Sequence, residues 1–538
     1  MHNKNELILS DLIALKAAQQ PDLDVLTFEH LSLDGGATPD EVRTYADLWR
    51  NANRLATRLQ ALGLCQGERF ALMMRNHPEF VEAMIAASLL GAVFVPIAPR
   101  TPAARLAFML RDSDCRGVIT ADYALAEVLT ARAQAPSVRW LLAIDSGEPG
   151  LPAVAGSAGV EDIAVALTIE GPEFAAAEVQ PTDAIQIIYT SGTTGDPKGI
   201  VGDHRRMGST PYVAQLFGYQ PDERPYTGLS FTHNNAQTTA LLPALKFGYR
   251  AVISRRFSKS RLWDIARRHG CTSFAVLGGM ATAIYSEPPR PDDADNPVRL
   301  VICSGMPATL WRRFEQRYGV ALFEIYGASD GGGMACNPPG QGPVGSFGKP
   351  VFGVQMKILD EAGDECPFGV VGEICCRPGD GSAARVEYHN NPEASRCKIV
   401  AGWNRSGDMG HRDAQGWLYY DHRKGGGIRR NGDFIDPAVV ERVVAEHPMV
   451  DDAYVYGVPA ASGATGERDL VVALVPVDAA AFDAAAVFAH CRTALEANSV
   501  PSWLQLLAEI PKTASEKPQE RFLLQDFNAG GPHLVAAR

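Results

Sequence analysis

The strongest chemical signal in the chain is a loop of small and hydroxyl-bearing residues within IIYTSGTTGDPKG at 187–199. A β-branched strand runs straight into this loop, which ends at Lys198. Glycines allow backbone N–H groups to close around phosphate oxygens, the hydroxyls add neutral donors and the lysine adds a positive charge. We therefore expect a polyphosphate to be bound by Thr190, Ser191, Gly192, Thr193, Thr194, Gly195 and Lys198.

This loop is not a Walker A loop. It lacks the G-x-x-x-x-G-K-[ST] spacing, and Pro197 would block a helix that starts at the lysine. The alternative interpretation is a surface turn of glycine, serine and threonine that binds nothing. Motifs elsewhere in the chain favour the phosphate loop.

Four further segments combine residue types suited to nucleotide chemistry. They are SGMP (304–307), YGASD (326–330), GWNRSGDMGHRDAQGWLYYDHR (402–423) and IPKTASEKPQERFL (510–523). Taken singly, they would be a strand-to-turn junction, a hairpin with acidic turns, or a solvated lysine near the C-terminus. Together with the phosphate loop, and in this order, they are similar to the motifs of the adenylate-forming superfamily of acyl-CoA synthetases, peptide-synthetase adenylation domains and luciferases.

The resemblance implies how the nucleotide is held. Backbone at 304–307 would lie against the adenine, a tyrosine would stack on the base, and a carboxylate and an arginine would bind the ribose hydroxyls. The implied adenine and ribose site comprises Gly305, Met306, Pro307, Tyr326, Gly327, Ser329, Asp408 and Arg423.

The same resemblance implies a Mg²⁺ ion at the acidic residue of YGASD, so Asp330 and Thr190 are the expected metal ligands. The family's usual residue is glutamate. Because aspartate is one methylene shorter, contact through a water molecule is an alternative to direct ligation.

Lys517 falls on the catalytic lysine of the family motif P-K-T-x-S-G-K. A lysine at that position would offset the negative charge that develops as a carboxylate attacks the α-phosphorus and pyrophosphate leaves. Glu516 and Pro518 replace the usual glycine and aliphatic residue. We expect a stiffer loop and a carboxylate that helps to keep the lysine protonated.

The segment after Arg423 resembles the family's hinge, with Gly425 at the hinge position. Three successive glycines at 425–427 would permit large backbone changes, although a plain flexible linker is an alternative. The next residues, RNGDFIDP at 430–437, resemble the G-G-E-x-I-x-P loop of acyl-CoA synthetases. This loop predicts coenzyme A as the acceptor, with a CoA-side loop formed by Asn431, Gly432 and Asp433.

The expected acyl pocket contains a histidine and several glycines. His233 matches the family's aromatic-plus-histidine motif, which implies that it gates the pocket and the approach of the thiol, although a lone histidine is often only structural. The pocket would be lined by His233, Asn235, Gly278, Gly279 and Gly331. So many glycines predict room for a bulky or polycyclic acid.

These residues need a scaffold of parallel strands and helices. The first half of the chain alternates helical patterns, such as 44–63 and 77–91, with short β-branched strands, such as 117–120. Such alternation is typical of βαβ units. We predict an α/β fold with a large N-terminal AMP-binding domain (1–421) that includes a β-barrel-like subdomain, a hinge (422–425), and a small mobile α+β domain (426–538).

Composition restricts the partners and the compartment. A net charge of −12 leaves no excess of basic residues for general nucleic-acid binding. Ten cysteines without a C-x-x-C pair predict reduced thiols, which fits a cytoplasmic protein. The apolar run 80–98 contains Glu82, Gly91 and Pro96, so we expect a buried helix and a strand and no membrane span.

Together these patterns predict an AMP-forming acid–thiol ligase. It would use ATP, Mg²⁺ and coenzyme A to convert a small-molecule carboxylic acid into acyl-AMP and then into acyl-CoA. Two alternatives stay open: a stand-alone adenylation enzyme that loads a carrier-protein thiol, and a degenerate nucleotide-binding protein without catalysis. A homodimer is a further possibility.

Overall fold

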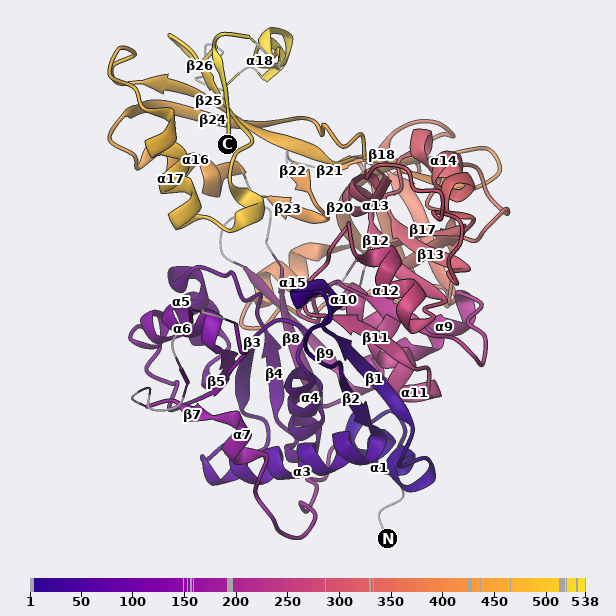
Figure 1. Cartoon of the computed structure of the whole chain (residues 1–538). Helices are drawn as coiled ribbons and strands as arrows, with labels where there is room; N and C mark the ends of the chain where they lie inside the picture. Colours follow the sequence, from indigo (N-terminus) through magenta and orange to yellow (C-terminus); the bar gives the residue numbers. More distant parts are fainter. Residues whose placement is uncertain are drawn as a thin grey trace.

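The computed structural model describes residues 4–148, 150–151, 153–154, 157, 159–190, 197–285, 287–328, 330–331, 333–423, 428–435, 437–464, 466–511, 518, 520–528 and 531–537. These residues form a large body and a smaller C-terminal domain that sits over one end of it (Figure 1).

The first sheet of the body has seven strands in the order β7-β6-β5-β3-β4-β8-β9. All neighbours are parallel except β8 and β9, which form an antiparallel pair at the edge. The strands are β3 (Arg69–Met73), β4 (Val93–Pro96), β5 (Cys115–Ala121), β6 (Trp140–Ile144), β7 (Glu161–Asp162), β8 (Ala184–Thr190) and β9 (Lys198–Asp203).

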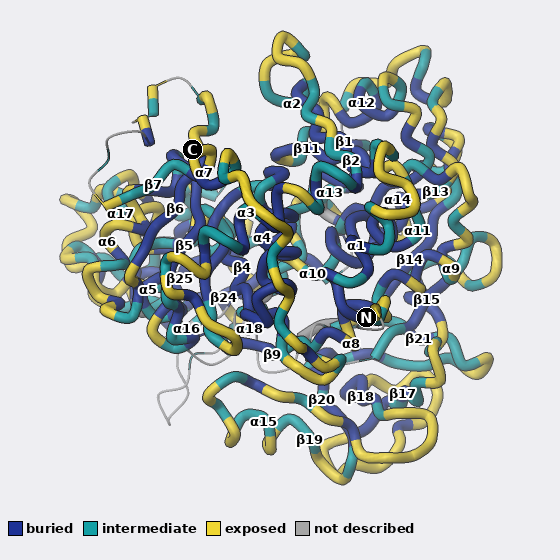
Figure 2. The backbone as a smooth tube through the Cα atoms, turned by 90° about the horizontal axis from the view of Figure 1, so that it is seen from below, coloured by how far each residue is buried: buried dark blue, intermediate teal, exposed yellow. Residues whose placement is uncertain are grey.

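Two helices between the sheets show why the apolar runs fold as they do. Helix α3 (Tyr45–Ala61) starts at a capping box in which Thr44 and Asp47 bond each other's backbone N–H groups. Helix α4 (Pro78–Leu90) is almost wholly buried and ends at Gly91, whose φ is 63°. Figure 2 shows α4 and the neighbouring strands mostly in the colour of buried residues. The predicted buried helix followed by a strand is confirmed, and no helix among the described residues is long and apolar enough to cross a membrane.

The second sheet has nine strands in the order β16-β15-β14-β13-β12-β10-β11-β1-β2, parallel in the middle and antiparallel at both ends. Its strands are β1 (Asp24–Glu29), β2 (Glu41–Thr44), β10 (Pro225–Thr227), β11 (Ala251–Ser254), β12 (Ser273–Leu277), β13 (Leu300–Ser304), β14 (Ala321–Gly327), β15 (Met334–Asn337) and β16 (Lys349–Pro350). Further helices cover the two sheets: α1 (Leu9–Gln19), α5 (Ala103–Asp112), α6 (Leu125–Arg132), α8 (His204–Ser209), α11 (Leu242–Phe247), α12 (Leu262–His269), α13 (Gly278–Tyr285) and α14 (Ala308–Tyr318).

The glycine- and proline-rich stretch after residue 340 forms an antiparallel sheet of five strands. They are β17 (Val354–Leu359), β18 (Gly372–Pro378), β19 (Ile399–Val400), β20 (Trp403–Arg412) and β21 (Leu418–Arg423), and helix α15 (Pro392–Lys398) precedes β19. This sheet is the predicted β-rich subdomain.

The C-terminal domain has a two-stranded hairpin and a four-stranded sheet with helices. The hairpin is β22 (Ile428–Arg430) and β23 (Asp433–Ile435), and the sheet is β24 (Val450–Pro459), β25 (Arg468–Pro476), β26 (Trp503–Leu506) and β27 (Leu534–Ala536). Its helices are α16 (Pro437–Ala445), α17 (Ala484–Ala494) and α18 (Glu520–Asp526). The hairpin faces the body, whereas α18 lies on the far side of the domain (Figure 1).

All ten cysteines are free thiols. Eight are buried, and only Cys65 and Cys397 are exposed. The predicted reduced, mostly buried thiols are therefore what the structure contains.

Candidate active site

The two ends of the predicted phosphate loop are adjacent in the structure. Thr190, the last residue of β8, pairs with Lys198, the first residue of β9, and β8 itself runs parallel to β4. The loop therefore leaves the carboxyl end of a strand in a largely parallel sheet, which is where such sheets bind ligands. Ser191, Gly192, Thr193, Thr194 and Gly195 lie outside the described residues.

Lys198 lies beside a segment from the β-rich subdomain. Its Nζ is 5.6 Å from the centroid of the Tyr388 ring. Tyr388 is held there because the chain at 387–389 runs along β9, where the backbone N–H of His389 donates to the carbonyl of Gly199 at 2.7 Å. Residues about 190 apart in the sequence thus meet at the end of the phosphate loop.

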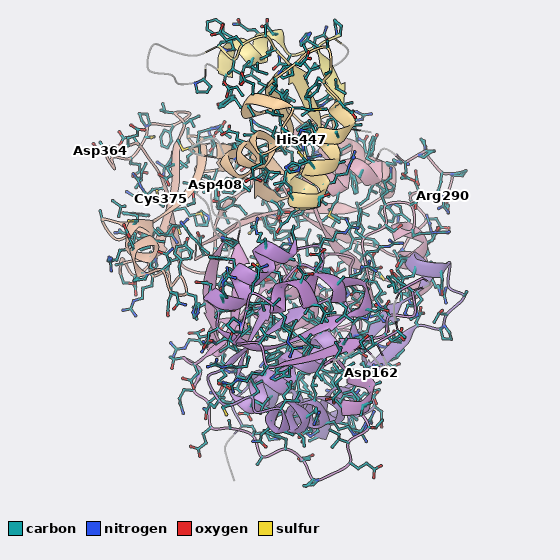
Figure 3. The ribbon with its side chains drawn as sticks, turned by 90° about the vertical axis from the view of Figure 1, so that its left-hand side faces the viewer. Asp162, Arg290, Asp364, Cys375, Asp408 and His447 are labelled. Atoms are coloured by element: carbon teal, nitrogen blue, oxygen red, sulfur yellow. The ribbon has the colours of Figure 1, made fainter. Side chains whose placement is uncertain are left out.

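The predicted adenine and ribose residues come from strands of two different sheets. Tyr326 on β14 donates its hydroxyl to Asp408 Oδ2 at 2.7 Å, and its ring stacks on Phe347 at 4.5 Å. Asp408 on β20 is buried and lies opposite Arg423 in the pairing with β21. Figure 3 labels Asp408 between Cys375 of the β-rich subdomain and His447 of the C-terminal domain. Three of the predicted residues are therefore neighbours; the side chain of Arg423 and the whole of Ser329 are outside the described set.

A buried glutamate that the sequence analysis did not single out fixes the 304–307 backbone. Glu324 accepts hydrogen bonds from the backbone N–H groups of Gly305 and Met306. Burial raises the pKa of Glu324 to about 8, and these two hydrogen bonds oppose the rise. Gly305 has a φ of 86°, and Pro307 is the N-cap residue directly before α14. A charged residue inside the apolar strand ALFEIYG, on the same face as Tyr326, was the signal that could have identified it.

Asp330 has protein partners at the carboxylate that the sequence assigned to Mg²⁺. Its Oδ2 accepts from the Tyr388 hydroxyl at 2.9 Å and lies 2.6 Å from the Lys398 ammonium. An ammonium in contact with the carboxylate occupies the place of a cation and repels a second one. Among the residues that the structure describes, no group of three or more His, Cys, Asp or Glu side chains could hold a metal ion. The Asp330 carboxylate is thus engaged by protein partners in this structure, and Asp330 and Thr190 as ligands of Mg²⁺ stay a prediction.

The predicted acyl residues lie around the start of two helices. His233 is exposed at the N-terminus of α10 (Asn234–Ala236), and the carbonyl of Asn235 accepts from Thr239 Oγ1 at 2.9 Å. Gly278 and Gly279 begin α13. A Cβ on Gly278 would lie 1.9 Å from the carbonyl oxygen of Gly305, so this glycine permits close packing between the predicted acyl and adenine segments. Gly331 has a φ of 83° in the turn after Asp330.

The hairpin of the C-terminal domain packs against these same segments. A Cβ on Gly432 would lie 2.4 Å from Leu277 Cδ1, one residue before Gly278. Asn431 and Asp433 are fixed within the domain by Asn498, whose amide contacts them at 2.7 and 2.6 Å. The predicted CoA-side loop is thus close to the predicted acyl pocket.

Arg429, a second residue that the sequence analysis missed, lies partly buried between the hairpin and the body, with its side chain 15% exposed. Its Nε is 3.3 Å from Glu467, and its guanidinium lies 5.1 Å from the centroid of the Tyr420 ring. Burial opposes its charge, but the neighbouring Tyr420, Glu467, Asp408 and Glu324 raise its pKa. The C-terminal domain therefore places a cation next to two acidic residues of the nucleotide site. The only sign of Arg429 in the sequence was its place in a run of charged residues next to glycines.

The predicted catalytic lysine and the hinge residue cannot be placed, since Lys517 and Gly425 lie outside the described residues. Helix α18 starts three residues after Lys517. It packs through Leu523 on Tyr456 and Val471 of the four-stranded sheet, on the face of the domain away from the body (Figure 1).

The sequence matches known families and proteins over most of its length. The profile of the AMP-binding enzyme family matches residues 13–383, and that of the AMP-binding enzyme C-terminal domain matches residues 439–517. The sulfoacetate–CoA ligase of Cupriavidus necator is 30% identical over 528 residues, which cover 96% of this chain and 97% of that protein.

Solved structures share the fold. A double mutant of o-succinylbenzoate CoA synthetase from Bacillus subtilis with a product analogue, OSB-NCoA, has a TM-score of 0.76 at 24% identity, covering 96% of this chain and 98% of that one. The same enzyme with its acyl-adenylate intermediate has a TM-score of 0.63, with the same identity and coverage. A mutant of an amide bond synthetase from Marinactinospora thermotolerans has a TM-score of 0.79 at 21% identity, covering 97% and 99% of the two chains.

These similarities confirm the resemblance and the α/β fold class that the motifs predict. The family profile alone covers well over half of the 538 residues. The chain belongs to the AMP-binding enzyme family, the adenylate-forming group that its phosphate loop and its nucleotide motifs resemble.

Proposed function

We propose that this chain is an AMP-forming acid–thiol ligase. It activates a carboxylic acid with MgATP to give acyl-AMP and pyrophosphate, and then transfers the acyl group to coenzyme A with release of AMP. The observation that carries the proposal is the position of the 428–435 hairpin, whose Gly432 packs on Leu277 beside the predicted acyl and adenine segments. A loop that resembles the CoA-side loop of acyl-CoA synthetases is thus next to the nucleotide site.

In the first half-reaction the body holds the nucleotide. The 190–198 loop and Lys198 bind the phosphates, while Tyr326, Asp408 and Arg423 hold the base and ribose. Asp408 is suited to ribose hydroxyls because a carboxylate has several acceptor sites, of which the Tyr326 hydroxyl uses one. Lys517 stabilises the charge that develops on the pentavalent α-phosphorus.

In the second half-reaction the hairpin covers the site. Docking of Gly432 on Leu277 and burial of Arg429 beside Asp408 and Glu324 exclude water from the adenylate and place a positive charge near the departing AMP. The TM-score is higher to the synthetase with a CoA product analogue than to the same enzyme with its adenylate intermediate. This difference supports the proposal that the hairpin lies as it does in the second half-reaction. We propose that rotation about the hinge at 422–425, centred on Gly425, exchanges Lys517 for the hairpin.

Three finer points belong to the same proposal. Mg²⁺ enters as part of the substrate MgATP. The acid is bulky or polycyclic, in line with the glycines at 278, 279 and 331–333. The enzyme works in the cytoplasm, with a homodimer as its candidate assembly, and its domain boundaries are those predicted from the sequence.

The test is pyrophosphate release from MgATP with a panel of acids, from short aliphatic through aryl to steroid-like, each with and without coenzyme A. Mass spectrometry of the products would identify acyl-CoA. We expect turnover that requires coenzyme A and favours bulky acids. Pyrophosphate release that is indifferent to coenzyme A but increases with a carrier-protein thiol would support the carrier-loading alternative, and no release with any acid would support the degenerate binder.

A further inference from the structure

The carboxylate of Asp330 lies in a group of positive charges. Its Oδ2 is 2.6 Å from Lys398 Nζ, and its Tyr388 partner lies under Lys198. Arg206 is a third cation: burial lowers its pKa, and the nearby Asp330 and Asp203 oppose that effect. With three cations and two carboxylates, this group attracts an anion and not a divalent cation.

Lys398 is built into this position and does not lie loosely on the surface. It is the last residue of α15, its side chain is 14% exposed, and its Nζ also donates to the carbonyl of Ser406 at 3.2 Å. The side chain of Asp330 is 16% exposed, and Asn404 Nδ2 donates to its backbone carbonyl at 2.9 Å. Both members of this partly buried pair are therefore fixed by further hydrogen bonds, which offset the cost of removing the two charges from water.

A second pair in the same subdomain shows what an ordinary surface ion pair looks like. Lys357 Nζ lies 2.6 Å from Glu365, the same separation, but the two side chains are 39% and 32% exposed. Exposed pairs contribute little to structure or to local potential. This pair is therefore a matched control for the pair at Asp330.

We infer that Lys398 supplies the positive charge that a protein-bound divalent ion would otherwise supply beside the phosphate loop. Its ammonium occupies Asp330, so Asp330 positions Lys398 and Tyr388 and does not bind the ion of MgATP. The short aspartate side chain agrees with this role, because the ammonium reaches the carboxylate itself. Lys398 is thus a positioning residue for the charge around the polyphosphate, and the ion is held through ATP.

The first test uses Mn²⁺ alone, followed by electron paramagnetic resonance, on the full chain without nucleotide. We expect wild type, Lys357→Met and Asp330→Asn to bind Mn²⁺ equally weakly, because Lys398 occupies the Asp330 carboxylate, and Lys198 and Arg206 add further positive charge nearby. A wild-type Mn²⁺ site that Asp330→Asn abolishes would overturn the inference.

The second test measures ATP–pyrophosphate exchange at constant MgATP and increasing free Mg²⁺, and it rests on the proposed function. We expect Lys398→Met to slow exchange by about 100-fold and to respond to free Mg²⁺, whereas Lys398→Arg and Lys357→Met behave as wild type. If Lys398→Met does not fold, the same exchange assay is carried out on Asp330→Asn. If Asp330→Asn needs as much free Mg²⁺ for exchange as wild type, the result agrees with the inference; if it needs about tenfold more, the result contradicts the inference. Since the Mn²⁺ experiment needs no turnover, failure of the proposed function would not be mistaken for failure of this inference.

Discussion

The nucleotide face of the body and the hairpin that covers it are held by different kinds of contact. On the body, the Tyr326 hydroxyl bonds Asp408, and Glu324 bonds the backbone of Gly305 and Met306. The hairpin instead meets the body through packing of Gly432 against Leu277 and through Arg429, whose guanidinium lies over the Tyr420 ring and beside the charges of Asp408 and Glu324.

The periphery of this interface is also weakly bonded. Arg105 of α5 and Glu496 of the C-terminal domain lie 3.3 Å apart, with both side chains about 30% exposed. An exposed ion pair of this kind contributes at most about 1 kcal/mol. The difference teaches that the nucleotide face can persist through both half-reactions, whereas the contacts of the hairpin are the ones that the proposed rotation breaks and remakes.

The largest expected effect is on the face that both half-reactions use. Asp408→Ala removes the acceptor of the Tyr326 hydroxyl and the proposed ribose ligand, so both adenylation and transfer should fall by roughly 10²- to 10³-fold. ATP–pyrophosphate exchange and acyl-CoA formation from supplied acyl-AMP would measure the two. Asp421→Ala, which removes an acid paired with His411 on the neighbouring strand, is the control. Loss of only one half-reaction in Asp408→Ala would contradict the claim that both half-reactions use the nucleotide face.

Gly432→Val should affect transfer alone. The added side chain would meet Leu277 in a backbone conformation with a φ of 82°, which keeps the hairpin from docking. We expect transfer to fall by roughly 100-fold and pyrophosphate exchange to stay within about twofold. Gly463→Val is matched, because Gly463 also has a positive φ, 69°, but faces open space. An equal loss in both variants would mean that backbone strain, and not docking, is responsible.

Arg429→Ala should reduce transfer by about tenfold, because it removes the partly buried cation beside Asp408 and Glu324. Arg429→Lys should retain much of the activity, since it keeps the charge. The neighbouring Arg430 bonds the carbonyls of Asn498 and Val500 within its own domain, so Arg430→Ala should affect stability and not the ratio of the half-reactions. A selective loss of pyrophosphate exchange in Arg429→Ala would contradict the role.

The smallest effect concerns the pH dependence of stability. The pKa of Glu324 is raised from 4.5 to about 8 in the folded chain, so between these values the folded state holds a proton that the unfolded chain has released. Stability should therefore fall as pH rises through this window, by about 1 kcal/mol per pH unit. Denaturant unfolding of Glu324→Gln should show a flatter profile than wild type from pH 6 to 8.

Glu365→Gln is the control for that experiment. Its hydrogen bond to Lys357 lowers the pKa of Glu365, so its contribution is lost only on acidification and leaves the pH 6 to 8 profile unchanged. Parallel profiles for wild type and Glu324→Gln would show that Glu324 is ionised in the folded chain.

Local patterns were enough to predict much of the body. The helix predicted at 44–63 and the helix stop at Gly91 depend on neighbouring residues only, and α3 (Tyr45–Ala61) and the end of α4 are where the sequence indicates. The motifs also identified Tyr326 and Asp408, which the structure brings into contact.

The residues that sequence reasoning missed depend on long-range contacts. Glu324, Lys398 and Arg429 carry no motif of their own. Each gains its role from a partner on another element: the backbone at 305–306, Asp330, and the acidic side chains of the nucleotide site. A shortened acid at 330 was visible in the sequence, but the lysine 68 residues later that accounts for it was not.

The central claim is that Lys517 serves adenylation and the hairpin serves transfer. The most direct test of this claim compares both half-reactions in Lys517→Ala with those in Gly432→Val. Lys517→Ala should abolish pyrophosphate exchange and leave transfer from supplied acyl-AMP largely intact, the reverse of the pattern for Gly432→Val. Equal loss of both half-reactions in Lys517→Ala, or the same pattern in both variants, would contradict the assignment of separate faces to the two steps.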